Sequence, residues 1–421
     1  MLIYSQDGLG LGHLRRTTLL AGEFLAARPH ASVLTISDSP LGQFFSSRVG
    51  HDYLKLPSIR KVGPGDWRPV SLSMGFSDVL RLRREIIRSS ALSFDPDVLL
   101  VDHMPHGAMG ELVPTLEALE GTRTKVVLGL RDILDAPATV RQRWHLEGAF
   151  EAVERHFDEV LVYGSRDVFD VSAEYHWPAA VRARLRYCGY VCSPTTTKTS
   201  VAKLRKRYLR SDPGADLVVA MAGGGADGEA LFSTLLSAVP GMERQRRCVV
   251  VIVTGPFLPR AEQRDLVRRA KGLPVHVVAA VQDSMTYLKA ADFVVAMAGY
   301  NTTAEILSLG KPALLVPRSG PSAEQQMRAR LFADRGWVGC LSPDSLSPRS
   351  LADAVLAGLD AGELRRTAAP DLDGRHAAAR QLLTGLRDAP GYPPPDVALL
   401  PVPGTPSSGA ELETEQLLSG G

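Results

Sequence analysis

The chain has 421 residues, of which 45% are hydrophobic and 22% are charged, a length and balance typical of a soluble globular protein with two ordinary domains. A formal net charge of +2 gives no whole-protein case for nucleic acid as a partner. Four cysteines are too few for a disulfide scaffold, and Cys188 and Cys192 have no second pair at zinc-site spacing. The sequence shows no secretory leader and no apolar run of membrane-spanning length, so a cytoplasmic location is expected.

Strand-like runs alternate with helical runs from the first residue onward, which predicts parallel, doubly wound α/β sheets. Six strands are expected at residues 2–5, 32–37, 52–56, 98–101, 125–130 and 159–163. The pattern then restarts, with strands expected at residues 217–221, 248–253, 275–278, 293–296 and 313–316.

This alternation predicts two Rossmann-like domains that face a cleft, in which the ligand is expected. The expected division is an N-terminal domain over residues 1–191, a linker over 192–200 and a C-terminal domain over 201–388. Residues 389–421 are rich in proline and serine, which predicts a disordered tail.

A first glycine-rich loop, residues 6–16, follows a strand and opens a helix, so its backbone could approach a ligand closely. A dinucleotide-binding loop, in which Asp38 would bind the ribose, does not fit the glycine spacing. The dinucleotide-binding fingerprint would need glycine at the position of His13 or of Arg15. Imidazole can accept a hydroxyl proton near neutral pH, so His13 is the candidate general base or acceptor-orienting group. The alternative is a helix N-terminal histidine that moves no proton.

Two further loops follow apolar strands and are therefore expected at the same edge of the sheet. Asp102, His103 and His106 lie in the first loop and could form an acid–base or acceptor-binding cluster. Arg131 and Asp132 hold the equivalent position after the next strand and, like Arg15, are acceptor-side candidates. Histidine and aspartate in one loop also fit metal ligation, but no further ligand is recognisable, so no metal is expected.

Residues 57–75 are expected to form a long irregular loop, which is usually functional. Arginines on the helix that follows, Arg83 among them, are interpreted as a solvated face, with anionic lipid headgroups or an acceptor phosphate as the alternative. The basic segment 203–210 is interpreted in the same way, so peripheral membrane association stays open.

The most specific pattern lies between residues 296 and 326. A buried strand ends near Gly299, and a helix follows whose first turn, with Asn301 and Thr302, offers free backbone N–H groups to an anion or a sugar nucleotide. Glu305 lies on this helix, and a Gly-Lys-Pro turn and a further strand lead to adjacent glutamines at positions 325 and 326. The alternative is an ordinary βαβ unit with a solvated helix face.

This pattern resembles the donor-binding half of family 28 glycosyltransferases. The resemblance implies a GT-B fold, in which Glu305 binds the ribose hydroxyls of a nucleotide sugar and Gln325 and Gln326 reach the sugar. It also implies a C-terminal helix, near residues 373–387, that packs back across the linker.

Other loops extend the resemblance. It implies that a second glycine-rich loop, residues 222–228, holds the donor diphosphate through backbone amides, because side chains would block the phosphates. Asp227 departs from the family pattern and would repel phosphate unless it pairs or points away. The remaining donor-binding candidates are Gly12, beneath the phosphates, Gly223, Gly224 and Gly225 in the second loop, Gly255 on the next strand, and Val281 near the base.

The function implied is transfer of a hexosyl group, N-acetylhexosaminyl included, from a nucleoside-diphosphate sugar to an acceptor hydroxyl. The nucleotide is expected to be UDP, the sugar nucleotide is a co-substrate, and no cofactor or metal is expected. A sugar-nucleotide 2-epimerase or hydrolase of the same fold is the enzyme alternative, and Asp102, His103 and Asp132 could serve it. A non-catalytic nucleotide-sugar-binding protein is the third interpretation.

Overall fold

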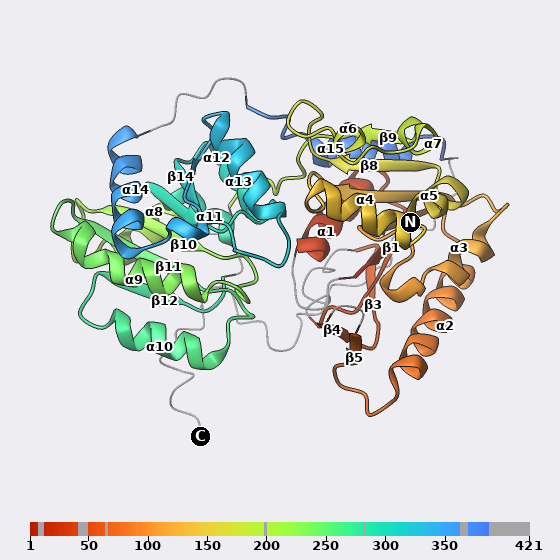
Figure 1. The fold of residues 1–421 in the computed structure, drawn as a ribbon, viewed down its shortest axis with the longest axis horizontal. Helices are drawn as coiled ribbons and strands as arrows, with labels where there is room; N and C mark the ends of the chain where they lie inside the picture. Colours follow the sequence, from red (N-terminus) through yellow and green to blue (C-terminus); the bar gives the residue numbers. More distant parts are fainter. Residues whose placement is uncertain are drawn as a thin grey trace. The chain divides into compact units, whose positions relative to one another are not determined.

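The computed structural model describes residues 1–6, 12–40, 49–63, 66–197, 200–281, 283–362 and 369–386. These residues form two compact units (Figure 1): unit 1 contains residues 1–191 and the segment that begins at Pro370, and unit 2 contains residues 192–369. Each unit is built around one parallel sheet, which confirms the predicted pair of Rossmann-like α/β domains.

Unit 1 has a seven-stranded sheet in the order β3-β2-β1-β6-β7-β8-β9, and all neighbouring strands are parallel. The strands are β1 (Leu2–Ser5), β2 (Val33–Ser37), β3 (His51–Lys55), β6 (Val98–Asp102), β7 (Lys125–Arg131), β8 (Glu159–Tyr163) and β9 (Leu185–Tyr187). The strand order reverses between β1 and β6. In open α/β sheets, ligands bind at the carboxyl ends of the strands beside such a switch point.

The helices of unit 1 follow the crossovers between these strands. They are α1 (Gly12–Ala27), α2 (Phe76–Phe94), α3 (Val113–Leu119), α4 (Pro137–Leu146), α5 (Ala149–His156), α6 (Val171–Glu174), α7 (Ala179–Ala183) and α15 (Gly374–Leu383), with a 3-10 turn η2 (Ala108–Gly110). Helix α15 packs on α1, so the C-terminal helix returns to unit 1, as the family resemblance implies. The boundary expected at residue 388 therefore does not hold for this helix.

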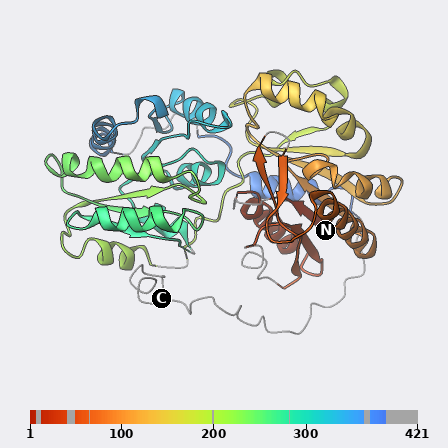
Figure 2. The same ribbon diagram turned by 60° about the horizontal axis from the view of Figure 1, so that its bottom comes forward.

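The segment expected to be irregular, residues 57–75, contains a two-stranded antiparallel hairpin of β4 (Ile59–Gly63) and β5 (Asp66–Pro69). Figure 2 shows these two strands in orange beside the rest of unit 1. Ile59 is buried against Val79 and Ala108, and Trp67 and Phe76 pack on this small cluster. The hairpin is therefore held by tertiary contacts with α2 and with the loop after β6.

Unit 2 has a six-stranded parallel sheet in the order β12-β11-β10-β13-β14-β15, with its switch point between β10 and β13. The strands are β10 (Asp216–Met221), β11 (Cys248–Val253), β12 (Val275–Val278), β13 (Phe293–Ala296), β14 (Ala313–Leu315) and β15 (Gly339–Cys340). Every residue of β11 and β13 is buried, which is why these strands are continuous apolar runs.

Two groups of helices cover this sheet. The helices are α8 (Val201–Tyr208), α9 (Glu229–Glu243), α10 (Arg260–Ala270), α11 (Ser284–Ala290), α12 (Tyr300–Leu309), α13 (Glu324–Asp334) and α14 (Pro348–Ala361), with a 3-10 turn η3 (Pro343–Ser345). Helix α9 packs with α10 and α14, and α11 packs with α8 and α12. Because the chain leaves the switch point in opposite directions, right-handed crossovers place α9 and α12 on opposite faces. The tail predicted over residues 389–421 lies outside the described residues.

Candidate functional site

Two predicted residues of unit 1 meet at its switch point. His13 is the second residue of α1, which follows β1, and Asp102 is the last residue of β6. Their Nδ1 and Oδ2 atoms lie 2.6 Å apart, with the carboxylate fully buried and the His13 side chain 18% exposed. The predicted histidine and aspartate therefore form a dyad whose imidazole still reaches the surface.

Arg16, which the sequence analysis did not single out, completes this cluster. Its Nη2 lies 2.7 and 2.9 Å from the two oxygens of Asp102, and its guanidinium lies over the ring of Tyr163 at 5.2 Å. Gly129 makes room for that ring, because a Cβ there would lie 2.2 Å from the Tyr163 hydroxyl. Arginine at helical spacing from His13 was visible in the sequence, but its burial was not.

The charges of this cluster fix the tautomer of His13. Burial disfavours ionisation of Asp102, but Arg16 and His13 outweigh that effect and lower the pKa of Asp102, so the carboxylate is an acceptor only. His13 Nδ1 lies 2.6 Å from this acceptor and 3.0 Å from Arg16 Nη2, which can only donate. The shorter contact, with the ionised carboxylate, is a hydrogen bond only when Nδ1 carries the proton, so we assign the proton to Nδ1. The Nε2 atom of the neutral ring then holds the lone pair, which a general base needs.

His103 lies next to the dyad, with its ring centroid 5.0 Å from that of His13. Its backbone has φ +83°, a left-handed conformation that costs free energy in a non-glycine residue and is common at functional sites. Burial, reinforced by Arg131 and other cations, holds the pKa of His103 well below its ordinary value, so this second imidazole is neutral. Within the described residues its buried Nδ1 has no hydrogen-bond partner.

The other acceptor-side candidates are more dispersed. Arg131 donates from Nη2 to the backbone oxygen of Leu134 at 3.3 Å, and Asp132 is 2% exposed. Burial lowers the pKa of His106, and its charged neighbours lie on α5 and just before it. Arg15 lies beside Arg16 on α1 and is partly exposed. Among these candidates, His13, Asp102 and His103 are joined by the contacts given above, and Arg131 lies close enough to His103 to lower its pKa.

The expectation that Arg83 lies on a solvated helix face is wrong. Its side chain is fully buried and forms a two-pronged ion pair with Glu111, at 2.5 Å from Nε and 2.6 Å from Nη2. The same Glu111 carboxylate accepts a hydrogen bond of 2.6 Å from the Tyr4 hydroxyl, and Arg83 also lies 3.4 Å from Asp38. Arg83 therefore anchors α2 to loops at the carboxyl edge of the sheet, and Asp38 serves the same network.

In unit 2, the glycines of the second loop form a cradle with the end of β11. Gly223, Gly225 and Gly255 all have positive φ, at +61°, +92° and +87°. A Cβ at Gly225 would lie 2.0 Å from the Thr254 oxygen, and one at Gly255 would lie 2.6 Å from Gly224. Nothing lies within 4 Å of the Cβ position at Gly223. Glycine is thus required where the two loops touch, and the backbone at Gly223 stays open to a ligand.

Helix α12 begins at the other side of this switch point, with Gly299 as its N-cap and no side-chain cap. The Gly299 Cβ position is also open, and the first helical turn carries Asn301 and Thr302. Glu305 is 2% exposed and accepts a hydrogen bond of 2.7 Å from the hydroxyl of Ser193, in the predicted linker. Its ribose role stays a prediction, and Ser193 is a partner that the sequence analysis missed.

The two predicted sugar-binding glutamines hold the loop after β14. Gln325 Oε1 accepts a hydrogen bond from the Arg318 backbone N–H at 3.3 Å, and Gln326 Nε2 donates to the backbone oxygens of Arg318 and Ser319 at 3.2 Å. Arg318 in turn lies 2.7 Å from Asp227. The acidic residue that departs from the family pattern is therefore paired with a cation. Val281, expected near the base, is partly exposed before α11.

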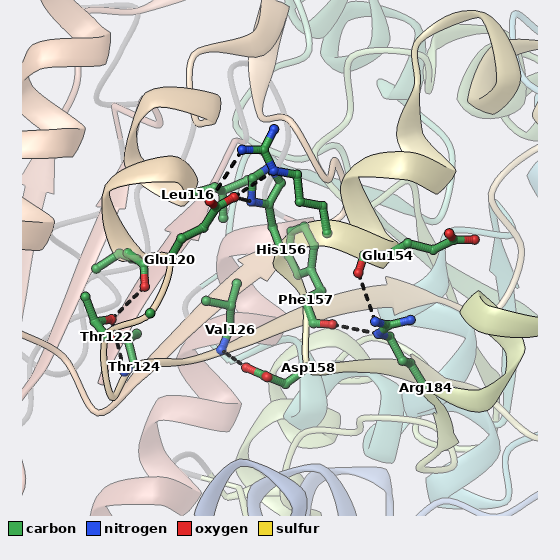
Figure 3. A pocket seen from close by; sticks show the side chains of 13 residues that line it. Leu116, Glu120, Thr122, Thr124, Val126, Glu154, His156, Phe157, Asp158 and Arg184 are labelled. Atoms are coloured by element: carbon green, nitrogen blue, oxygen red, sulfur yellow. Dashed lines mark hydrogen bonds and ion pairs between the residues drawn. The ribbon is translucent and has the colours of Figure 1, made fainter.

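Figure 3 shows a separate pocket of about 510 Å³ at the amino ends of β7 and β8 in unit 1. None of the predicted site residues lines it. Arg155 and His156 lie 2.8 and 3.0 Å from Glu120, and Asp158 accepts a hydrogen bond from the Val126 backbone. These polar groups bind one another and the backbone, so the pocket carries no functional assignment.

In the described ranges, no three or more His, Cys, Asp or Glu side chains are grouped as metal ligands would be. In the same part of the chain, no helix combines the length and the apolarity that a membrane crossing needs.

Comparison with known sequences finds similarity in the C-terminal part of the chain. Residues 218–381 match the profile of the Glycosyltransferase family 28 C-terminal domain. The UDP-N-acetylglucosamine–N-acetylmuramyl-(pentapeptide) pyrophosphoryl-undecaprenol N-acetylglucosamine transferase of Rickettsia massiliae is 27% identical over 168 residues, which cover 39% of this chain and 44% of that protein. The chain thus spans about half the length of the relatives it matches.

Solved structures share the fold over a larger part of the chain. MurG of Acinetobacter baumannii aligns with a TM-score of 0.54 at 15% identity, covering 90% of this chain and 94% of that one. A putative UDP-N-acetylglucosamine 2-epimerase from Listeria monocytogenes aligns with a TM-score of 0.57 at 14% identity, covering 90% of both chains. The chain therefore has the GT-B fold, and its C-terminal half resembles family 28 glycosyltransferases, the peptidoglycan-precursor N-acetylglucosaminyltransferases among them.

Proposed function

We propose that this protein transfers a hexosyl group from a nucleoside-diphosphate sugar, with UDP as the expected nucleotide, to an acceptor hydroxyl. The observation that carries the proposal is the dyad of unit 1. The ionised Asp102 holds the Nδ1 proton of His13, and Nε2 is left to take the proton of the acceptor hydroxyl. A cytoplasmic location is part of the same proposal.

Unit 2 would hold the donor. The glycine cradle and the amino end of α12 offer backbone N–H groups at the switch point, which suits a diphosphate. Glu305 would bind the ribose hydroxyls, and Gln325 and Gln326 would reach the sugar. In this scheme the base accepts the acceptor proton while backbone dipoles stabilise the negative charge that develops on the leaving diphosphate. The scheme requires no bound metal or cofactor.

Calorimetric titration with UDP, GDP and dTDP tests the donor side. We expect one nucleotide to bind and Glu305→Ala to weaken it by about 1–3 kcal/mol, as loss of a charged hydrogen bond would. Glu243→Ala, at an exposed position of α9, is the matched control and should change nothing. If no nucleotide binds, or if Glu305→Ala is silent, the donor assignment fails.

A sugar-nucleotide hydrolase or 2-epimerase is the second candidate, and the position of His103 favours it. Two imidazoles and a carboxylate gather at one point, and such a cluster could activate water or move a proton on the sugar. Product analysis without acceptor separates the candidates, because free sugar or an epimer would form only in this second case. If donor binds but no product forms with any acceptor, and His13→Ala changes nothing, the protein is a non-catalytic binder.

A further inference from the structure

The loop after β14 presents an arginine to the glycine cradle of unit 2. Arg318 Nη1 lies 2.7 Å from Asp227 Oδ2, although 91 residues separate the two in the chain. Asp227 belongs to the loop after β10, and β13 lies between β10 and β14 in the sheet. The ion pair therefore spans the carboxyl end of β13, where Gly299 opens α12.

The guanidinium of Arg318 has N–H donors beyond the one that contacts Asp227. Its Nε is buried and has no hydrogen-bond partner among the described residues, and its Nη2 lies 3.8 Å from Glu324, beyond hydrogen-bond distance. A guanidinium carries five N–H donors in a planar fork that matches phosphate and carboxylate groups. The one short contact to Asp227 uses only a part of this capacity.

The backbone that carries Arg318 is fixed in position. Gln325 and Gln326 hydrogen-bond to the backbone N–H and oxygen of Arg318, and Arg328 donates to the Ala298 oxygen on the neighbouring loop at 2.8 Å. The Arg318 side chain is 25% exposed and that of Asp227 is 50% exposed. The carboxylate could therefore return to water without leaving a buried charge.

We propose that Arg318 binds an anionic group of the donor, either in the diphosphate or on the sugar, and that Asp227 holds its guanidinium in place until the donor arrives. This inference rests on the proposed role of unit 2 in donor binding. An unpaired Asp227 in a phosphate-binding loop would repel the ligand, and the ion pair removes that repulsion. An incoming anion can then replace Asp227 as the partner of the fork, with two parallel hydrogen bonds in place of one, while the half-exposed carboxylate turns into water and away from the ligand.

Substitution of Arg318 should weaken donor binding and substitution of Asp227 should not, whereas a purely structural ion pair would make the two substitutions equivalent. Titration of the full chain should show about 10-fold or greater weakening in Arg318→Gln, since charged hydrogen bonds are lost, with UDP if the anion is in the diphosphate and with UDP-glucuronic acid if it is on the sugar. Arg318→Lys, which lacks the fork, should recover the affinity incompletely. Asp227→Asn should bind UDP as tightly as the unmodified protein or a few-fold more tightly, because a competing carboxylate is removed. Uridine, without phosphates, should bind all variants alike.

Two further ligands locate the anion. Weakening already seen with UDP assigns Arg318 to the diphosphate, whereas weakening seen with UDP-glucuronic acid but with neither UDP nor UDP-glucose assigns it to a sugar carboxylate. Equal weakening in Arg318→Gln and Asp227→Asn, or no change for any ligand, would overturn the inference while nucleotide binding itself survived. If the unmodified protein binds none of UDP, GDP and dTDP, the proposed function fails and this inference fails with it. Circular dichroism of each variant verifies that the fold is retained.

Discussion

Replacing Asp102 with asparagine should invert the tautomer of His13. The carboxylate accepts hydrogen bonds from His13 at 2.6 Å and from Arg16 at 2.7 Å, and it is fully buried between them. An asparagine has one acceptor oxygen, and the charged Arg16 would take it. The amide N–H₂ group would then face Nδ1 of His13 and donate to it, so that the remaining ring proton moves to Nε2.

This inversion should abolish base catalysis without abolishing donor binding. In serine-protease triads, a wrong histidine tautomer lowers turnover by roughly 10⁴-fold, and we expect a loss of at least about 10³-fold for Asp102→Asn. The affinity for nucleotide should stay unchanged, because the donor candidates with the most specific pattern lie in unit 2. A defect in both turnover and nucleotide affinity would instead indicate a general structural loss.

The same substitution should reduce stability by an amount set by the buried Arg16. Removing one partner of a buried ion pair costs about 3–5 kcal/mol, and the hydrogen bond that asparagine keeps with Arg16 returns about 1 kcal/mol. We therefore expect a loss of about 2–4 kcal/mol in urea unfolding at neutral pH. Asp78→Asn, which breaks an exposed pair with Arg81, should cost less than about 1 kcal/mol.

The pH dependence of this loss follows from the lowered pKa of Asp102. A carboxyl whose pKa is lower in the folded state stabilises the fold above its unfolded pKa of about 3.9, and that stabilisation is lost as the pH falls through the folded value. The difference between the unmodified protein and Asp102→Asn should therefore be full at neutral pH and should shrink below about pH 4. A difference that grows in acid would contradict the assignment of an ionised carboxylate.

Nuclear magnetic resonance reads the tautomer without any substrate. Two-bond ¹H–¹⁵N spectra distinguish Nδ1–H from Nε2–H, and His13→Gln assigns the signal among the 10 histidines of the chain. The unmodified protein should show Nδ1–H in the neutral ring, and Asp102→Asn should show Nε2–H. An Nε2–H ring in the unmodified protein would refute the reasoning from which the base assignment follows.

Two further substitutions test the packing that surrounds the candidate sites. Gly225→Ala and Gly272→Ala both place alanine at positive φ, but only Gly225→Ala puts a Cβ against the Thr254 oxygen. Only Gly225→Ala should therefore abolish nucleotide binding in calorimetry. Equal effects of the two substitutions on binding would contradict the role of the glycine cradle. Arg83→Met should destabilise the protein by about 3–5 kcal/mol in urea unfolding, because it leaves the Glu111 carboxylate buried without its cation. Adding Glu111→Gln should restore part of that loss, and simple additivity of the two losses would argue against a coupled pair.

Strand positions were predictable because burial on both faces leaves a strong local pattern. The expected strands at residues 159–163 and 248–253 coincide with β8 and β11. The sheet edges β9 and β15 were missed, because three and two residues are too short to carry a pattern. The β4–β5 hairpin was missed for another reason: its polar, glycine-containing strands pair because Ile59 and Trp67 pack on α2, a contact that no local pattern encodes.

The candidate site was predictable in its residue types and not in its pairings. Polar residues in the loops that follow apolar strands gather at the carboxyl edge of a parallel sheet. For this reason His13 and Asp102 could both be predicted as candidates at one edge. Which cation would join them could not be predicted, because Arg16 and Arg83 lie on helices whose sequences also contain arginines that are not buried. Burial of an arginine depends on a carboxylate that is distant in sequence, such as Glu111 for Arg83.

Both units place a buried arginine near the switch point, and in unit 2 this is Arg328, which donates to the Ala298 oxygen. The units differ in what else supports their loops. In unit 1, buried arginines bind carboxylates that end or follow strands, as in the pairs of Arg16 with Asp102 and of Arg83 with Glu111. Buried ion pairs contribute little net stability compared with apolar packing, but breaking one partner is costly, so such pairs fix position more than they stabilise. In unit 2, glycines let two backbones touch and leave N–H groups exposed. A base must be oriented through its hydrogen bonds, whereas a diphosphate needs unobstructed backbone, and each unit has the kind of loop support that its proposed chemistry requires.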